Sequence, residues 1–191
     1  MARAVFLDRD GVLIVDADLL TDPAHIQPLP GVAAALRRLQ AAGFRLIVVS
    51  NQPVVARGLA TEREVEAIHQ EIQRQIVRDG GPTLDAFYFC PHHPRATLEE
   101  YRRDCECRKP RAGLLRQGAA AFGIDLKSSF MVGDRITDIA AGAAVGCRTV
   151  MVETGKHLLP PIHTSEPLDP GLKPDWTCAD LPAAADWILA Q

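Results

Sequence analysis

The sequence predicts a doubly wound α/β domain, in which a parallel sheet is covered by helices on both faces. Three observations support this fold class. Short apolar runs alternate with helical stretches along the chain. These runs, of which 44–49 is the clearest, are apolar at nearly every position, which is typical of strands buried on both faces. Polar clusters follow several runs, at the strand ends where such sheets bind ligands.

The first half of the chain is expected to contain three strands and two helices. The strands are predicted over 4–7, 44–49 and 84–89. A helix over 31–42 is indicated by apolar residues that recur on one face and by Gly43, which stops it. Thr61 and Glu64 have the spacing of a capping box and begin a second helix over 61–79.

The second half continues the alternation. Strands are predicted over 130–132 and 149–152, and helices over 112–122, 136–145 and 180–190. Two long stretches, 91–111 and 153–175, are expected to be irregular, and the prolines of the second indicate a surface loop. The lengths between the polar clusters leave no room for a large cap domain.

The bulk properties favour one folded domain over residues 1–191. Apolar residues make up 47% of the chain and charged residues 24%, as in ordinary globular proteins. The net charge of −3 argues against nucleic acid or an anionic membrane as the main partner. No apolar run is long enough to span a bilayer, and the first residues do not resemble a signal peptide. The cytoplasm is therefore the default compartment. We also expect a monomer that acts on a small molecule.

Asp8 and Asp10 stand two residues apart directly after the first predicted strand, so in an extended chain they point the same way. Two neighbouring carboxylates are costly unless a cation lies between them, and Mg²⁺ prefers oxygen ligands. One carboxylate can then attack phosphorus while the other gives a proton to the leaving alcohol. Gly11 permits a sharp turn after them. Taken alone, D-x-D-G is equally compatible with a solvated turn.

Three further clusters favour phosphoryl transfer over a simple turn. Ser50-Asn51 offer a hydroxyl and an amide to phosphate oxygens after the second strand. Arg108-Lys109 supply two cations before a helix, and Asp134 offers a third carboxylate after another strand. A phosphoryl transition state spreads charge over its oxygens, so fixed donors and cations are the main catalytic requirement.

The order D-x-D-G, S-N-Q, K-P, G-D-x-x-x-D resembles the four motifs of the haloacid dehalogenase superfamily, over residues 8 to 138. The resemblance implies an aspartyl-phosphate mechanism, with Asp8 as nucleophile and Asp10 as general acid and base. It implies Mg²⁺ held by Asp8, by the backbone carbonyl of Asp10 and by Asp134. The residues expected to bind the phosphoryl group or the substrate are Asp16, Ser50, Asn51, Gln52, Arg57, Arg108, Lys109 and Arg135.

Asp138 lies one helical turn beyond Asp134. It can orient its neighbours, bind the metal indirectly, or only place a negative charge at a helix N-terminus. We prefer the last interpretation, because acidic side chains are favourable in the first turn of a helix.

A second cluster combines three cysteines with a histidine: Cys90, His92, Cys105 and Cys107. Thiolates and imidazole are the ligands that zinc prefers in closed, structural tetrahedral sites. His93 is the rival imidazole ligand. A loop of free cysteines is disfavoured, because clustered exposed thiols are prone to oxidation.

The fragment C-P-H-H-P…C-x-C-R-K-P resembles the zinc loop of the D-glycero-D-manno-heptose-1,7-bisphosphate 7-phosphatases and of the related histidinol-phosphate phosphatases. The resemblance implies a structural zinc in a loop over about 90–110 that presents Arg108 and Lys109 to the substrate. Arg57, in Ala56-Arg57-Gly58, and Arg135 favour the heptose enzymes. A histidinol-phosphate phosphatase and a non-catalytic module that binds a sugar phosphate remain the alternatives.

Some loops depart from the heptose pattern. Ile14 replaces an Asn, Asp18-Leu19 replace a Gly-Tyr pair, and Pro53-Val54 replace Ser-Gly. We expect these changes to lie in substrate-facing loops and to bear on the choice of sugar, whereas Asp16 is kept as a partner for sugar hydroxyls.

The remaining polar and aromatic residues are expected to be structural. His69 is expected on the surface of its helix. Lys156, after Thr154-Gly155, can reach the site, but we favour a solvated loop lysine. Trp176 and Trp187 are expected to serve in packing. His163 has no partner residue at a spacing typical of a functional motif.

Overall fold

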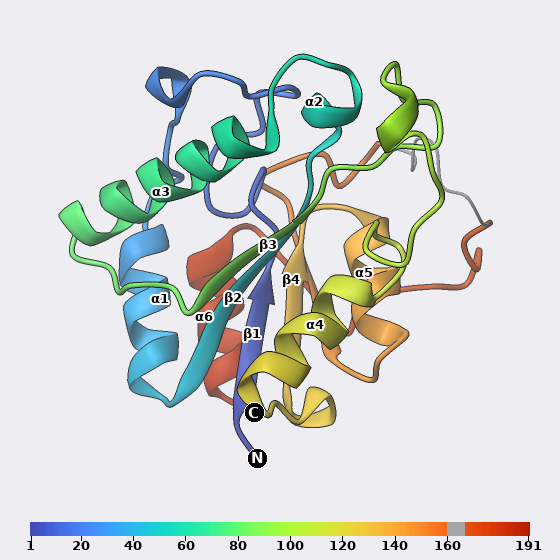
Figure 1. Cartoon of the computed structure of the whole chain (residues 1–191). Coiled ribbons are helices and arrows are strands. Elements are labelled where there is room, and N and C mark those ends of the chain that lie inside the picture. Colours follow the sequence, from blue (N-terminus) through green and yellow to red (C-terminus); the bar gives the residue numbers. More distant parts are fainter. Residues whose placement is uncertain (160–166) are drawn as a thin grey trace.

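A computed structural model describes residues 1–159 and 167–191. His163 lies outside the described residues. Six parallel strands form one sheet in the order β3-β2-β1-β4-β5-β6 (Figure 1). The strands are β1 (Arg3–Leu7), β2 (Phe44–Asn51), β3 (Ala86–Cys90), β4 (Phe130–Gly133), β5 (Arg148–Val152) and β6 (Trp176–Cys178). This topology confirms the predicted fold class, and no large cap is present among the described elements.

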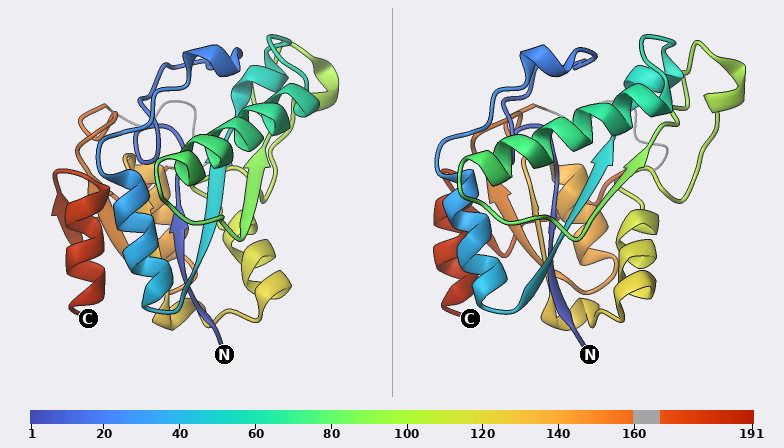
Figure 2. Two further views of the ribbon diagram at one scale, coloured as in Figure 1. Left: turned by 90° about the vertical axis from the view of Figure 1, so that its left-hand side faces the viewer. Right: turned by 60° about the vertical axis from the view of Figure 1, so that its left-hand side comes forward.

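Helices cover both faces of the sheet, as the two views in Figure 2 show. They are α1 (Val32–Ala41), α2 (Pro53–Ala56), α3 (Glu62–Arg78), α4 (Gly113–Phe122), α5 (Ile136–Ala143) and α6 (Leu181–Leu189). Apolar residues of α1, α3 and α6 pack against one face, and those of α4 and α5 against the other. None of the described helices is long and apolar enough to cross a membrane.

Strand β1 shows why the strands are apolar throughout. Val5 and Leu7 contribute to one core cluster, whereas Ala4 and Phe6 contribute to the other. All four side chains are fully buried. Because successive side chains of a strand point to opposite faces, a strand with helices on both sides has no polar position.

The register of the central strands brings the polar clusters to one edge of the sheet. Leu7 pairs with Val48 of β2 and with Val132 of β4. The residues that follow these three strands therefore emerge side by side at the carboxyl edge, the usual ligand-binding edge of such sheets.

The predicted strands and long helices are all found, with boundaries shifted by at most two residues. Two elements were not anticipated. Helix α2 has only four residues, too few for a periodic pattern. Strand β6 has three residues, of which the first two are exposed. It pairs with β5 and forms an edge of the sheet.

The prediction that His69 lies on the surface is wrong. Its side chain is 4% exposed. Helix α3 packs over the edge strand β3, where the imidazole stacks on Phe87 at 5.0 Å between ring centroids and meets Phe89 edge-on at 5.5 Å. Trp176 and Trp187 stack on each other at 6.0 Å, in agreement with their expected packing role.

Candidate active site and metal centre

The chain turns sharply after β1, and glycine makes the turn possible. Gly11 has a φ of 76°, in the left-handed region. A Cβ atom on Gly11 would lie 2.6 Å from Oδ2 of Asp134, and one on Gly155 would lie 2.1 Å from the same oxygen. The two glycines therefore allow two loops to close around the Asp134 carboxylate.

Lys109 is the central cation of the site. Its Nζ lies 3.0 Å from Oδ1 of Asp8 and 2.7 Å from Oδ1 of Asp138, and it donates to the carbonyl of Val49 at 2.7 Å. The side chain amide of Asn51 exchanges two 3.0 Å hydrogen bonds with the backbone of Lys109 and so fixes its position. Burial lowers the pKa of Lys109, but the charges of Asp138 and Asp8 outweigh it and leave the pKa raised. The ammonium therefore stays charged.

Three buried carboxylates crowd together beside this cation. Asp8, Asp134 and Asp138 each offer an oxygen, and these oxygens lie within 4.8 Å of one another. Burial and the charges of Asp138 and Asp8 raise the pKa of Asp134 to about 8. Burial, opposed by Lys109, raises the pKa of Asp138 to about 6.

This arrangement fits a divalent cation. Oδ1 of Asp134 is buried and has no hydrogen-bond partner among residues 1–159 and 167–191. An orphaned carboxylate oxygen inside an acidic cluster is what a hard cation such as Mg²⁺ satisfies.

Asp138 forms an ion pair in addition to the helix cap that we expected. Its carboxylate accepts the backbone N–H of Arg135 at 3.0 Å, which caps α5 as the helix-terminus interpretation requires. The same side chain is fully buried and forms the ion pair with Lys109. It therefore also orients the central cation.

Asp10 is held by two neighbours. Nε and Nη2 of Arg9 contact its carboxylate at 2.7–3.2 Å, and Nε2 of Gln52 donates to its Oδ2 at 2.9 Å. Partial removal from water raises the pKa of Asp10, and Arg9 opposes this effect. Gln52 also donates to Oγ of Ser50 at 2.8 Å, so one buried amide links the two side chains.

A pocket of about 420 Å³ opens over this edge of the sheet. Among the predicted site residues, it is lined by Asp8, Asp10, Asp16, Ser50, Asn51, Arg57, Arg108, Lys109 and Arg135. Gln52 is buried behind the lining and reaches the pocket only through its hydrogen bonds to Asp10 and Ser50.

The interpretation of Lys156 as a solvated loop lysine is wrong. Its backbone N–H donates to Oδ2 of Asp134 at 2.7 Å, and its side chain lines the pocket. Its Nζ lies 3.0 Å from Oδ1 of Asp16 and also bonds to Asp18. The sequence indicates only that Lys156 follows the carboxyl end of a strand, where the strand ends converge on the site; its contact with the distant Asp16 is decided by the fold.

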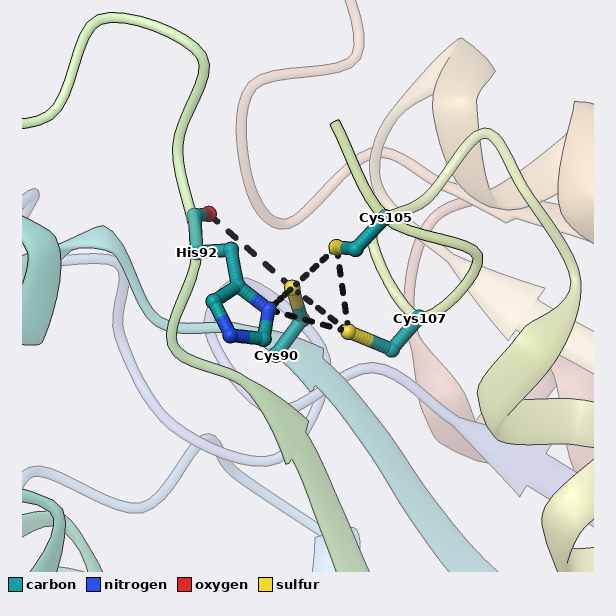
Figure 3. A group of neighbouring side chains, drawn as sticks. All are labelled: Cys90, His92, Cys105 and Cys107. Atoms are coloured by element: carbon teal, nitrogen blue, oxygen red, sulfur yellow. Dashed lines mark hydrogen bonds between the residues drawn. The ribbon is translucent and has the colours of Figure 1, made fainter. Parts of the chain in front are cut away.

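The cysteine cluster forms a second centre (Figure 3). The Sγ atoms of Cys90, Cys105 and Cys107 lie 3.1–3.4 Å apart. Nδ1 of His92 lies 3.4 Å from the Cys107 sulfur and 3.7 Å from the Cys90 sulfur. Zinc–sulfur bonds of about 2.3 Å in a tetrahedron place sulfur atoms about 3.8 Å apart, so the four donors need to move little to enclose a zinc ion.

The environment of the thiols also suits a metal. A hydrogen bond from Cys90 is the main cause that lowers the pKa of Cys107 to about 5, which favours the thiolate form that binds zinc. His93 instead accepts the backbone N–H of Arg95 at its Nδ1 and lines the substrate pocket. Nη1 of Arg108 donates to the carbonyl of His92 at 3.2 Å, so the cluster is tied to the pocket wall.

Comparison with known proteins identifies the family. A family model described as HAD-hydrolase-like matches residues 106–184. The D-glycero-beta-D-manno-heptose-1,7-bisphosphate 7-phosphatase of Escherichia coli K12 is 38% identical over 185 residues, which cover 95% of this chain and 92% of that protein. The chain belongs to the D-glycero-D-manno-heptose-1,7-bisphosphate 7-phosphatase family of the haloacid dehalogenase superfamily. The protein of the same name from Salmonella typhi is 39% identical over 97% of this chain and 89% of its own length.

Solved structures of this family agree. The D,D-heptose 1,7-bisphosphate phosphatase of B. bronchiseptica, complexed with magnesium and phosphate, superimposes with a TM-score of 0.81. It is 33% identical and covers 98% of both chains. The corresponding enzyme of Burkholderia thailandensis has a TM-score of 0.68 and 30% identity over 99% of both chains.

The departures from the 7-phosphatase family pattern fall into two groups. Leu19 and Pro53 line the pocket, as expected, and Asp18 has a φ of 62° where the family pattern has glycine. The expectation is wrong for Ile14 and Val54, which are each 1% exposed and belong to the apolar core. The replacement of Asn by Ile14 is therefore a change in packing.

Proposed function

We propose that this chain is a magnesium-dependent phosphatase that removes the 7-phosphate of D-glycero-D-manno-heptose 1,7-bisphosphate, on the route to ADP- or GDP-heptose. The observation that carries the proposal is the buried Lys109, which joins the Asp8 and Asp138 carboxylates at the strand ends. A fixed cation beside a carboxylate nucleophile is what phosphoryl transfer requires. The similarity to heptose bisphosphate phosphatases over nearly the whole chain supports the sugar substrate.

The proposed reaction has two steps. The Asp8 carboxylate attacks phosphorus while the bond from phosphorus to the sugar oxygen breaks, and Asp10 gives its proton to that oxygen. Asp10 then takes a proton from water, which attacks the aspartyl-phosphate and releases phosphate and Asp8. Lys109 and the Ser50 hydroxyl hold the phosphate oxygens. Bound by Asp8, Asp134 and the Asp10 carbonyl, Mg²⁺ would supply positive charge to the phosphoryl oxygens.

The rest of the pocket supports a substrate with a second anionic group. Arg57 is exposed at the end of α2, and Arg108 lines the wall that the cysteine cluster supports. Two guanidinium groups in the lining of the pocket suit the phosphate that is not cleaved. Asp16, held between Arg135 and Lys156, supplies a carboxylate for sugar hydroxyls. The volume of about 420 Å³ is in the range of small-molecule sites.

We also propose a structural zinc ion bound by Cys90, His92, Cys105 and Cys107, which shapes the wall and takes no part in the chemistry. The four donors already face one another across 3.1–3.7 Å. We further propose that the protein acts as a monomer in the cytoplasm; light scattering of the purified protein tests the monomer.

Phosphate release from heptose bisphosphate, with and without Mg²⁺, tests the function. We expect turnover only with Mg²⁺, a fall of at least about 10³-fold in Asp8→Asn because the nucleophile is lost, and much slower turnover of histidinol phosphate. Faster turnover of histidinol phosphate would reassign the substrate. A protein that binds the sugar phosphate without releasing phosphate would be the non-catalytic module.

A further inference from the structure

Arg9 is a buried cation that the proposed mechanism does not use. It lies between Asp8 and Asp10 in the sequence, yet its side chain is 1% exposed. Burying a guanidinium is costly unless it is paired and hydrogen-bonded. The carboxylate of Asp10 is its ion-pair partner, and Nη1 has no hydrogen-bond partner among the described residues. Because its burial is unfavourable, we expect the Arg9 guanidinium to have a specific role.

The contacts of Arg9 define the orientation of the Asp10 carboxylate. Nε lies 3.2 Å from Oδ1 and 3.1 Å from Oδ2, and Nη2 lies 2.9 Å from Oδ1 and 2.7 Å from Oδ2. Gln52 donates to Oδ2 as well, at 2.9 Å. Oδ2 therefore accepts hydrogen bonds from two residues, whereas both donors to Oδ1 within the described part of the chain come from Arg9. Oδ1 thus faces two donor nitrogens against three at Oδ2, and it is the less engaged of the two oxygens.

From this geometry we infer that Arg9 is a positioning residue, which fixes the Asp10 carboxylate so that its Oδ1 exchanges the proton with the leaving oxygen. The inference rests on the proposed function. In the first step the proton on Oδ1 passes to the sugar oxygen as the bond from that oxygen to phosphorus breaks. In the second step Oδ1 takes a proton from the attacking water.

An arginine suits this role better than a lysine. The guanidinium presents its donors in a rigid plane, so two nitrogens together fix the plane of a carboxylate. An ammonium is a single flexible point charge and leaves the carboxylate free to rotate. Proton transfer depends on this orientation, because a small misplacement of a catalytic group can reduce the rate by about 10²-fold.

The test compares two leaving groups in single turnovers, with enzyme in excess and Mg²⁺ present. Release of the dephosphorylated sugar from heptose bisphosphate needs a proton from Asp10, whereas nitrophenolate leaves from p-nitrophenyl phosphate without one. Release of the alcohol or phenol under these conditions reports the first step alone. The variants are Arg9→Met and Arg9→Lys, with melting temperatures measured for each.

We expect Arg9→Met to slow the first step about 10²-fold with the sugar phosphate and less than about threefold with p-nitrophenyl phosphate, with KM nearly unchanged. Arg9→Lys should fall between wild type and Arg9→Met. Arg45→Met is the matched control, since Arg45 forms a 2.6 Å ion pair with Asp85 outside the pocket. It should leave both rates unchanged.

Equal losses with the two substrates, or no loss, would overturn the inference and make Arg9 a purely structural residue. If Arg9→Met does not fold, the ratio of the two rates in Arg9→Lys decides by the same criterion. Wild-type protein that turns over neither substrate would instead contradict the proposed function, so the two failures are distinguishable.

Discussion

At the scale of single residues, burial separates the side chains that organise the site from those that we expect to contact the substrate. Lys109, Gln52 and Asp138 are at most 2% exposed, and each contacts another site residue. Arg57 is exposed, and Arg108 is half-buried at the pocket wall. We therefore expect substitutions in the first group to change the rate of chemistry, and those in the second to change substrate binding.

His69 gives a prediction about acid stability. Burial, and to a smaller extent the charge of Arg9, lowers its pKa from 6.5 to about 3. The unfolded chain takes up a proton below pH 6.5 that the folded protein excludes down to about pH 3. Within that window, the exclusion of this proton lowers the free energy of unfolding by up to about 1.4 kcal/mol for each unit by which the pH falls.

His69→Phe should remove this acid-dependent loss, because an apolar ring fills the space beside Phe87 without taking up a proton. Urea unfolding at pH 7 and pH 5 checks it, with His25→Phe at an exposed histidine as the control. A loss of stability between the two pH values as large in His69→Phe as in wild type would contradict the prediction.

At the scale of elements, one loop links the cysteine cluster to Lys109. Cys107 is two residues from Lys109, and Arg108 between them donates to the carbonyl of His92. Gly113 begins α4 where a Cβ atom would lie 2.3 Å from the carbonyl of Glu106, so the loop packs tightly on the helix that follows. The conformation of this loop therefore determines the positions of the Arg108 and Lys109 side chains.

Loss of a zinc ligand should loosen this loop, because the fold of a structural zinc site depends on the metal. We expect Cys107→Ser to bind little zinc, to be cleaved by protease within about 90–110, and to raise KM about tenfold or more. Cys178→Ser, distant from the cluster, should behave as wild type. Metal analysis checks the premise: protein purified without chelator and without nearly stoichiometric zinc would refute it.

At the scale of the whole molecule, the order of the strands brings together the carboxylates of the proposed metal centre. Asp8 follows β1 and Asp134 follows β4, and these strands are neighbours although more than 120 residues separate them in the sequence. A cation bound between them joins the two halves of the sheet. Anything that binds only the folded state stabilises it, by about 2.7 kcal/mol at a concentration 100 times the Kd.

Mg²⁺ should therefore raise the melting temperature of wild type, and Asp134→Asn should abolish most of this rise. The amide keeps an acceptor for the backbone N–H of Lys156 but removes one negative ligand. Asp125→Asn, which alters a cap at the opposite end of β4, should keep the response to Mg²⁺. Equal Mg²⁺ responses in the two variants would rule out Asp134 as a ligand.

The sequence by itself determined the fold class and most of the site. Strands that are apolar at nearly every position and the capping box of Thr61 and Glu64 follow from local rules of burial and hydrogen bonding. The carboxylates at the strand ends can likewise be recognised from the local sequence. These features were sufficient to assign the sheet, to propose Asp8, Lys109 and Asp134, and to group the four residues proposed to bind zinc. That the chain forms one domain over 1–191, and what each site residue does, stay predictions.

Only the tertiary structure decided which side chains are buried and which face the pocket. The burial of His69 depends on the packing of α3 over β3, and Lys156 reaches Asp16 from a loop 140 residues away. Arg9 is buried against Asp10, a placement that the sequence analysis did not anticipate. Contacts of this kind arise from the arrangement of elements that are distant in the chain, and no local pattern of residue types records them.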